Sequence, residues 1–255
     1  MFCSSRVSSR EDAWPLWLLR RVGADKLGEM NAERGGTGLR CWRLAKSGIR
    51  VRFVCSDCNN GWMSELESRA KPVIEPLLDD APHVLAADHQ RTLAVWAVKS
   101  AMVFEALRLN HPWVFTHEER TQLRESSTLP PRTKVWIAKC INLTGPCCAA
   151  SDLFNKAPAS TDQERAYVTT MAFGPLAIQV LNFRLPYIVP DSVDITTALR
   201  PGPWDSVAAQ VWPHLQPLVS WPATMGLGGE AGFSAFCDRW KPPGGGPRGD
   251  HGAVE

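Results

Sequence analysis

The pattern Cys55-x-x-Cys58-Asn59 combines the residue types and spacing in this chain that best suit metal chemistry. Two residues between the cysteines allow a tight turn to direct both sulfur atoms at one ion, with Zn–S bonds of about 2.3 Å. Such a pair supplies half of a tetrahedral site, so further ligands must come from elsewhere in the chain. The alternative is that Cys55 and Cys58 are unligated thiols in a turn, which the Asn-Asn-Gly-Trp sequence after them disfavours.

A β-hairpin predicted over residues 39–54 suggests a third thiol ligand. Residues 49–54 alternate apolar and basic side chains, as a half-buried strand does, and they follow turn residues around Ser47. Folding the hairpin about this turn brings Cys41 opposite the end of the second strand, next to Cys55. Cys41 is therefore a candidate ligand of the same ion.

The same segment is basic, with no acidic residue between Glu33 and the cysteine pair. The alternation places Arg50 and Arg52 on one face of the predicted strand, and Arg43 and Lys46 precede it. Clustered positive charge of this kind fits the phosphates of a nucleic acid, which position a protein without specifying sequence. An exposed hairpin face can also be basic for solubility and to protect an edge strand, so both interpretations stay open.

Helices are predicted on either side of these motifs. Pro15 suits the first turn of a short helix, and Glu11 and Asp12 lie just ahead of it. Apolar residues recur at steps of three and four over residues 62–77, the spacing of a buried helical stripe. The two prolines within that stripe are expected to kink or end the helix.

The later part of the chain is predicted to combine helices with an antiparallel sheet. The strongest amphipathic pattern covers residues 90–109, and a shorter helix is expected at 116–124, capped reciprocally by Thr116 and Glu119. Strands are then predicted at 134–138, 167–173 and 176–183, the last two as a hairpin. The expected fold class is therefore α+β.

Composition places the chain among globular proteins long enough for two domains. Of its 255 residues 44% are apolar and 21% charged, and a net charge of +2 does not by itself argue for nucleic acid. We predict a first domain at 1–82, a second at 83–240 and a disordered, proline- and glycine-rich tail at 241–255. With eight cysteines and neither a secretory signal nor a membrane-spanning run, a cytoplasmic location without membrane contact is expected.

Two of these motifs together resemble HNH-type nucleases of the ββα-metal superfamily, in particular small bacterial and phage HNH-like proteins. They are Glu11-Asp12-Ala13-Trp14-Pro15 and Cys55-x-x-Cys58-Asn59-Asn60-Gly61-Trp62. The resemblance covers about the first third of the chain. It implies a small, zinc-stapled ββα-metal domain ahead of the helix-plus-antiparallel-sheet domain, DNA as the partner, and hydrolysis of phosphodiester bonds.

The resemblance also implies roles for individual residues. Cys55 and Cys58 would hold a structural Zn²⁺ ion, while Glu11 and Asn59 would bind a catalytic Mg²⁺ or another divalent cation. That cation would stabilise charge on the scissile phosphate while a neighbouring base deprotonates the attacking water. Asp12 stands where the family has its general-base histidine, and because a carboxylate is intrinsically a weaker base than an imidazole, slower catalysis is expected.

A second departure concerns the zinc ligands. Cys3 stands where the second cysteine of an N-terminal clamp belongs, and the first would precede Met1. Either the natural chain starts upstream, or the site combines three thiolates with a substitute such as Cys41.

Two functions from different classes follow from this sequence. The first is an HNH-like, metal-dependent endonuclease, or a descendant that kept the site and lost speed. The second is a non-catalytic zinc-stapled module that binds nucleic acid or a protein. A plainer third reading makes zinc purely structural and assigns an unrelated function to the second domain, which carries no phosphate loop, nucleotide fingerprint or nucleophile motif.

Overall fold

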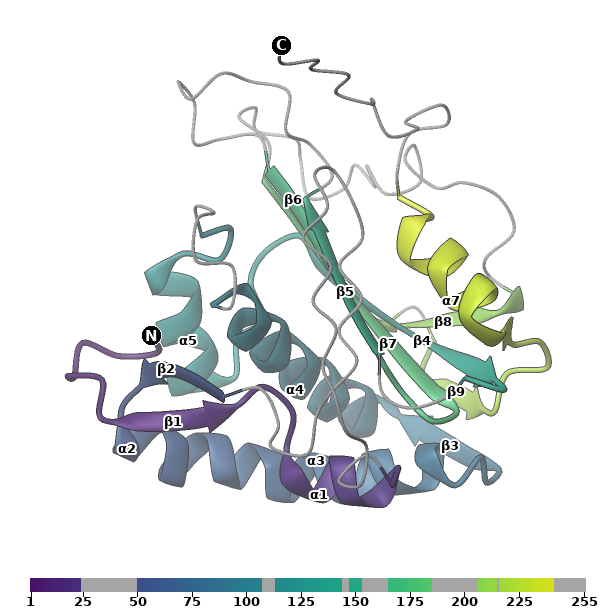
Figure 1. Cartoon of the computed structure of the whole chain (residues 1–255), viewed down its shortest axis with the longest axis horizontal. Helices are drawn as coiled ribbons and strands as arrows, with labels where there is room; N and C mark the ends of the chain where they lie inside the picture. The colour runs from purple at the N-terminus through teal and green to yellow at the C-terminus, as the bar shows by residue number, and fades with distance from the viewer. Residues whose placement is uncertain are drawn as a thin grey trace, which may run out of the picture.

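The computed structural model has mixed α and β structure, with helices on both faces of a sheet (Figure 1). This agrees with the predicted α+β class, while the ββα-metal identity of the N-terminal part stays a prediction. The structure describes residues 1–23, 50–106, 113–143, 147–152, 165–184, 206–214 and 216–240. The tail predicted at 241–255 lies outside these stretches.

Within the described stretches, the large sheet has six strands, paired in the order β10-β4-β7-β6-β5, with β8 also paired to β4. Its strands are β4 (Thr133–Ile141), β5 (Cys147–Asp152), β6 (Arg165–Phe173), β7 (Leu176–Arg184), β8 (Ala208–Trp212) and β10 (Leu227–Gly228). The pairs are antiparallel except that of β10 with β4. The strands predicted at 134–138, 167–173 and 176–183 are thus confirmed, and β6 and β7 form the predicted hairpin.

Helices cover both faces of this sheet. Along β4, Val135 and Ile137 belong to the core shared with helix α4 (Ala87–Glu105), whereas Trp136 belongs to the core shared with α7 (Gly229–Asp238). This alternation follows from the two-residue period of a strand, which directs successive side chains to opposite faces. The sheet is therefore buried on both sides.

The central helix α4 lies between the sheet and helix α3 (Ser64–Leu78) (Figure 1). Every residue of α4 from Leu93 to Glu105 is buried, and the helix predicted at 90–109 is confirmed. The prolines were expected to kink or end α3, and the second alternative is wrong, because the helix continues past both prolines to Leu78. Burial of the apolar stripe of α3 against α4 outweighs the hydrogen bond lost at each proline.

Helix α5 (His117–Ser126) confirms the helix predicted at 116–124 together with its cap. The Thr116 hydroxyl accepts a hydrogen bond from the Glu119 backbone N–H at 3.1 Å. In return, the Glu119 carboxylate accepts one from the Thr116 backbone N–H at 2.7 Å. Both donors would otherwise lack an intrahelical partner.

A two-stranded antiparallel sheet joins β1 (Ser9–Asp12) to β2 (Arg50–Val54). The strand predicted at 49–54 is thus present, and its partner among the described residues is β1. The other strand of the predicted hairpin, around Cys41, lies outside the described residues. Segments widely separated in the sequence therefore meet at this small sheet.

Short elements connect this small sheet to the helices. Helix α1 (Leu16–Arg21) begins directly after Pro15, as predicted. After β2, the one-turn helix α2 (Ser56–Cys58) and the segment η2 (Asn59–Met63), which is kinked at the non-helical Gly61, lead into α3. Away from this region, β3 (His83–Ala86) pairs antiparallel with β9 (Leu218–Trp221).

Buried side chains from both predicted domains pack in one hydrophobic cluster. Trp14, two residues after the end of β1, has its ring centroid 5.5 Å from that of Phe104 in α4 and 5.2 Å from that of Phe173 in β6. The division at residue 82 stays a prediction, and it separates stretches that share this core. Among the described residues, no helix is both long and apolar enough to cross a membrane.

Candidate metal centre and adjoining pocket

Three of the predicted ligands, Cys3, Cys55 and Cys58, meet in one cluster. Their Sγ atoms all lie within 4.8 Å of one another, and Cys3 Sγ is 3.4 Å from that of Cys55 and 3.5 Å from that of Cys58. Tetrahedral bonds of about 2.3 Å to zinc would place two sulfurs about 3.8 Å apart. The cluster is therefore compatible with a metal ion such as zinc.

The local sequence explains how these thiols converge. Cys55 has an extended backbone and caps α2, where its Sγ accepts a hydrogen bond from the Cys58 N–H at 3.4 Å. Cys3 comes from the N-terminal segment, which is held by the neighbouring Phe2. The Phe2 ring is fully buried and meets the Trp62 ring edge-on, with 5.0 Å between centroids. The tryptophan of the second motif thus helps to place the first cysteine.

The three thiols differ in their readiness to ionise. Although burial acts to raise it, hydrogen bonds from Ser5, Cys55 and Cys58 lower the pKa of Cys3 to about 7. Burial and hydrogen bonds with Cys55 and Cys3 raise the pKa of Cys58 to about 12. Because a metal binds the thiolate, loading the cluster must release protons and will depend on pH.

The other ligand and contact residues predicted from the sequence are less well placed. Cys41, Arg43 and Lys46 lie outside the described residues, as does the side chain of Arg50. Arg52 is exposed on β2. The structure therefore brings together three of the four predicted thiols, and it locates one of the four predicted basic contacts at the surface.

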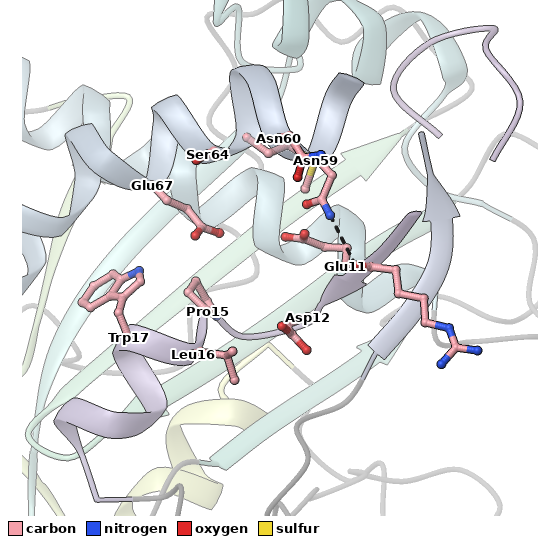
Figure 2. A pocket seen from close by; sticks show the side chains of 11 residues that line it. Glu11, Asp12, Pro15, Leu16, Trp17, Asn59, Asn60, Ser64 and Glu67 are labelled. Atoms are coloured by element: carbon pink, nitrogen blue, oxygen red, sulfur yellow. Dashed lines mark hydrogen bonds between the residues drawn. The ribbon is translucent and has the colours of Figure 1, made fainter. Parts of the chain in front are cut away.

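A pocket of about 330 Å³ is lined in part by Asn59, the residue that follows Cys58 (Figure 2). It is lined by Arg10, Glu11, Asp12, Pro15, Leu16, Trp17, Asn59, Asn60, Met63, Ser64 and Glu67. The three predicted catalytic residues, Glu11, Asp12 and Asn59, are all among them. They come from β1 and from the residue directly after Cys58.

The Asn59 side chain is tied to β1 by its amide nitrogen. Nδ2 donates hydrogen bonds to Ser9 Oγ at 2.8 Å and to the backbone carbonyl of Arg10 at 3.3 Å. A backbone carbonyl can only accept, so the nitrogen end of the amide must face β1. The oxygen end is left toward the Glu11 carboxyl in the pocket (Figure 2), where it could serve as a cation ligand.

Lys99 of α4 is the site residue that sequence reasoning missed. Its Nζ lies 3.0 Å from a carboxylate oxygen of Glu67 and 3.5 Å from one of Glu11. The lysine is fully buried, and an unpaired buried ammonium would be very costly. A signal was available, because Lys99 is the one charged residue between Leu93 and Phe104. A charge inside an apolar helix needs a buried partner.

Burial raises the pKa of Glu11 to about 7, although the attraction of Lys99 acts to lower it and the charge of Glu67 acts to raise it. The contact with Lys99 does not override burial, because the ammonium is shared and lies nearer to Glu67. The Glu11 carboxyl therefore exchanges protons near neutral pH, as a general acid or base does.

No protein-family model, curated protein or solved structure matches this chain. Function must therefore be inferred from the residues and geometry of the cluster and its pocket.

We predict that the purified protein carries about one thiolate-bound metal ion, zinc by preference, per chain. Replacing Cys55→Ser or Cys58→Ser should remove this ion and lower stability, because two thiolates cannot close the site. The measurement is elemental analysis by mass spectrometry with parallel denaturation. Cys237→Ser, a buried thiol of α7, should keep the ion. Full metal occupancy in the Cys58→Ser protein would contradict the assignment.

We also predict that Glu11 makes stability fall as pH rises. Its folded-state pKa of about 7 exceeds its ordinary value of 4.5. The native state therefore holds more protons than the unfolded state between these values. The free energy of unfolding should drop by up to about 3 kcal/mol over that window.

Glu11→Gln should remove this component, as urea denaturation at several pH values without added divalent ions would show. Glu65→Gln, an exposed change on α3, should keep the wild-type slope. Identical pH profiles for wild type and Glu11→Gln would refute the prediction.

Proposed function

We propose that this chain is an HNH-like, metal-dependent endonuclease that hydrolyses DNA phosphodiester bonds. One observation carries the proposal. The thiol cluster leads directly into Asn59, which lines the same pocket as Glu11 and Asp12, although Asn59 lies far from these two residues in the sequence. The pairing of a structural metal with a neighbouring acidic and amide-lined pocket is what the two sequence motifs imply.

In this proposal the cysteine cluster has a structural role. Zinc held by Cys3, Cys55 and Cys58 would fix the N-terminal segment to α2. That attachment would keep β1 against β2 and keep Asn59 facing Glu11. The zinc ion would hold these elements in place without taking part in hydrolysis, because none of its ligands lines the pocket.

In this proposal the residues that carry out hydrolysis line the pocket. Glu11 and the side-chain oxygen of Asn59 would hold Mg²⁺ or another divalent cation, which supplies charge stabilisation at the scissile phosphate and the leaving oxygen. Asp12 would take the proton of the attacking water, as the general base does in related sites. Arg10, exposed at the pocket, and Arg52, exposed on β2, would contact phosphates of the DNA backbone.

The proposal predicts that the protein nicks or cuts plasmid DNA with Mg²⁺ or Mn²⁺ present. Asn59→Ala should abolish this cleavage, because it removes a ligand of the catalytic cation. Gel analysis of supercoiled plasmid measures the rate. Gln122→Ala removes another side-chain amide, on α5, and should leave the rate unchanged. Absence of cleavage with every divalent ion tested, in protein that retains its thiolate-bound metal, would exclude the enzymatic function.

A second candidate is a non-catalytic zinc module that binds nucleic acid or a protein. Two observations favour it: Asp12 occupies the position of the general base, and Glu11 is already engaged by Lys99. Both features would slow or prevent hydrolysis while leaving a basic surface intact.

Restoring the base distinguishes the two candidates. Asp12→His should raise the cleavage rate if the site lacks nothing but a base that is effective at neutral pH. Asp57→His, on the exposed side of α2, is the matched control and should have no effect. No gain in cleavage, combined with DNA binding that weakens steeply with salt, would favour the binding module.

A further inference from the structure

A buried positive charge, that of Lys99, contacts carboxylates that line the pocket. Three carboxylates line it, those of Glu11, Asp12 and Glu67, and the Lys99 ammonium reaches the first and the last of these from α4. Lys99 is fully buried, so neither solvent nor salt screens it as they would a surface charge. An acidic pocket of this kind therefore has a fixed internal counter-ion.

This ammonium lies where it would repel a second cation. Lys99 Nζ is 3.5 Å from the Glu11 oxygen, and a Mg²⁺–oxygen bond is about 2.1 Å long. A divalent ion on that oxygen would thus lie no more than about 6 Å from the ammonium. Because it carries two charges, it would be repelled twice as strongly as a proton at the same place.

We infer that Lys99 is the resident cation of this pocket and that its ammonium keeps divalent-ion affinity low until a phosphodiester contributes further anionic oxygens. The inference rests on the proposed function, since it concerns the same cation site. It makes Lys99 a positioning residue that acts on the metal through Glu11 and Glu67. Metal and nucleic acid then bind cooperatively, and the free protein carries little divalent metal in the pocket.

Removing the ammonium tests this directly. Mn²⁺ binding to the free protein would be measured by electron paramagnetic resonance, without chelator, so that metal at the cysteine cluster is retained. Lys99→Met should bind Mn²⁺ at least tenfold more tightly than wild type, although loss of the ammonium also favours the protonated form of Glu11. The net result should still be tighter Mn²⁺ binding, because the ammonium repels a doubly charged ion more strongly than it repels a proton.

Matched variants separate this effect from general disturbance. Lys99→Gln removes the charge but keeps hydrogen-bond donors for both carboxylates, and it should also bind Mn²⁺ more tightly. Lys71→Met removes a lysine from the same helix as Glu67, where its side chain is 48% exposed, and should leave Mn²⁺ affinity within about twofold of wild type. Mn²⁺ affinity that is equal to wild type or weaker in folded Lys99→Gln overturns the inference.

The unchanged protein supplies an independent measurement. A short DNA duplex should raise wild-type Mn²⁺ affinity at least tenfold, after subtraction of Mn²⁺ bound by the duplex alone, and this gain should be lost in Glu11→Ala. Tight Mn²⁺ binding by wild type without DNA would refute the inference even if plasmid cleavage is observed. Tighter binding by the Lys99 variants without any cleavage would support the inference and refute the nuclease.

Discussion

The burial of the Lys99 ammonium is the constraint on which the pocket depends. Placing an isolated charge at the centre of α4 would cost several kcal/mol, so carboxylates must reach it from the surrounding elements. Glu67 reaches it from α3 and Glu11 from β1. Because each partner belongs to a different element, one charge sets how a helix and a strand stand against α4. The walls of the pocket are fixed by this requirement rather than by local helix or strand propensity.

Apolar contacts also hold β1 and the N-terminal segment in place. Trp14 lies two residues after the end of β1 and packs on Phe104 and Phe173, while Phe2 next to Cys3 packs on Trp62. Trp14 is therefore a core residue and Trp62 is half-buried against the core, and the polar residues next to them are placed by that packing. A substitution in the core near these motifs would also disturb the site, because core residues and site residues are neighbours in the sequence.

Structural features that depend on residues close together in the sequence were predicted correctly. The capping box of Thr116 and Glu119, the β6–β7 hairpin and the spacing of Cys55 and Cys58 all rest on interactions within a few residues, and each is present. The hairpin strand predicted near Cys41 lies outside the described residues and stays a prediction. The pairing of β1 with β2 joins segments that no local pattern relates, so it was not predicted. The contact of Lys99 with Glu11 and Glu67 was missed for the same reason, since it depends on three elements meeting in space. The continuation of α3 past its prolines was misjudged because tertiary packing outweighed a local penalty.

The cysteine cluster joins the N-terminal segment to α2. Cys3 meets Cys55 and Cys58, and β1 pairs with β2, so two contacts join segments that are widely separated in the sequence. The entropic cost of closing such a connection grows slowly, by about 0.6 kcal/mol for each doubling of its length. A metal ion bound by the three thiols would therefore offset an entropic cost that depends little on how many residues separate Cys3 from Cys55.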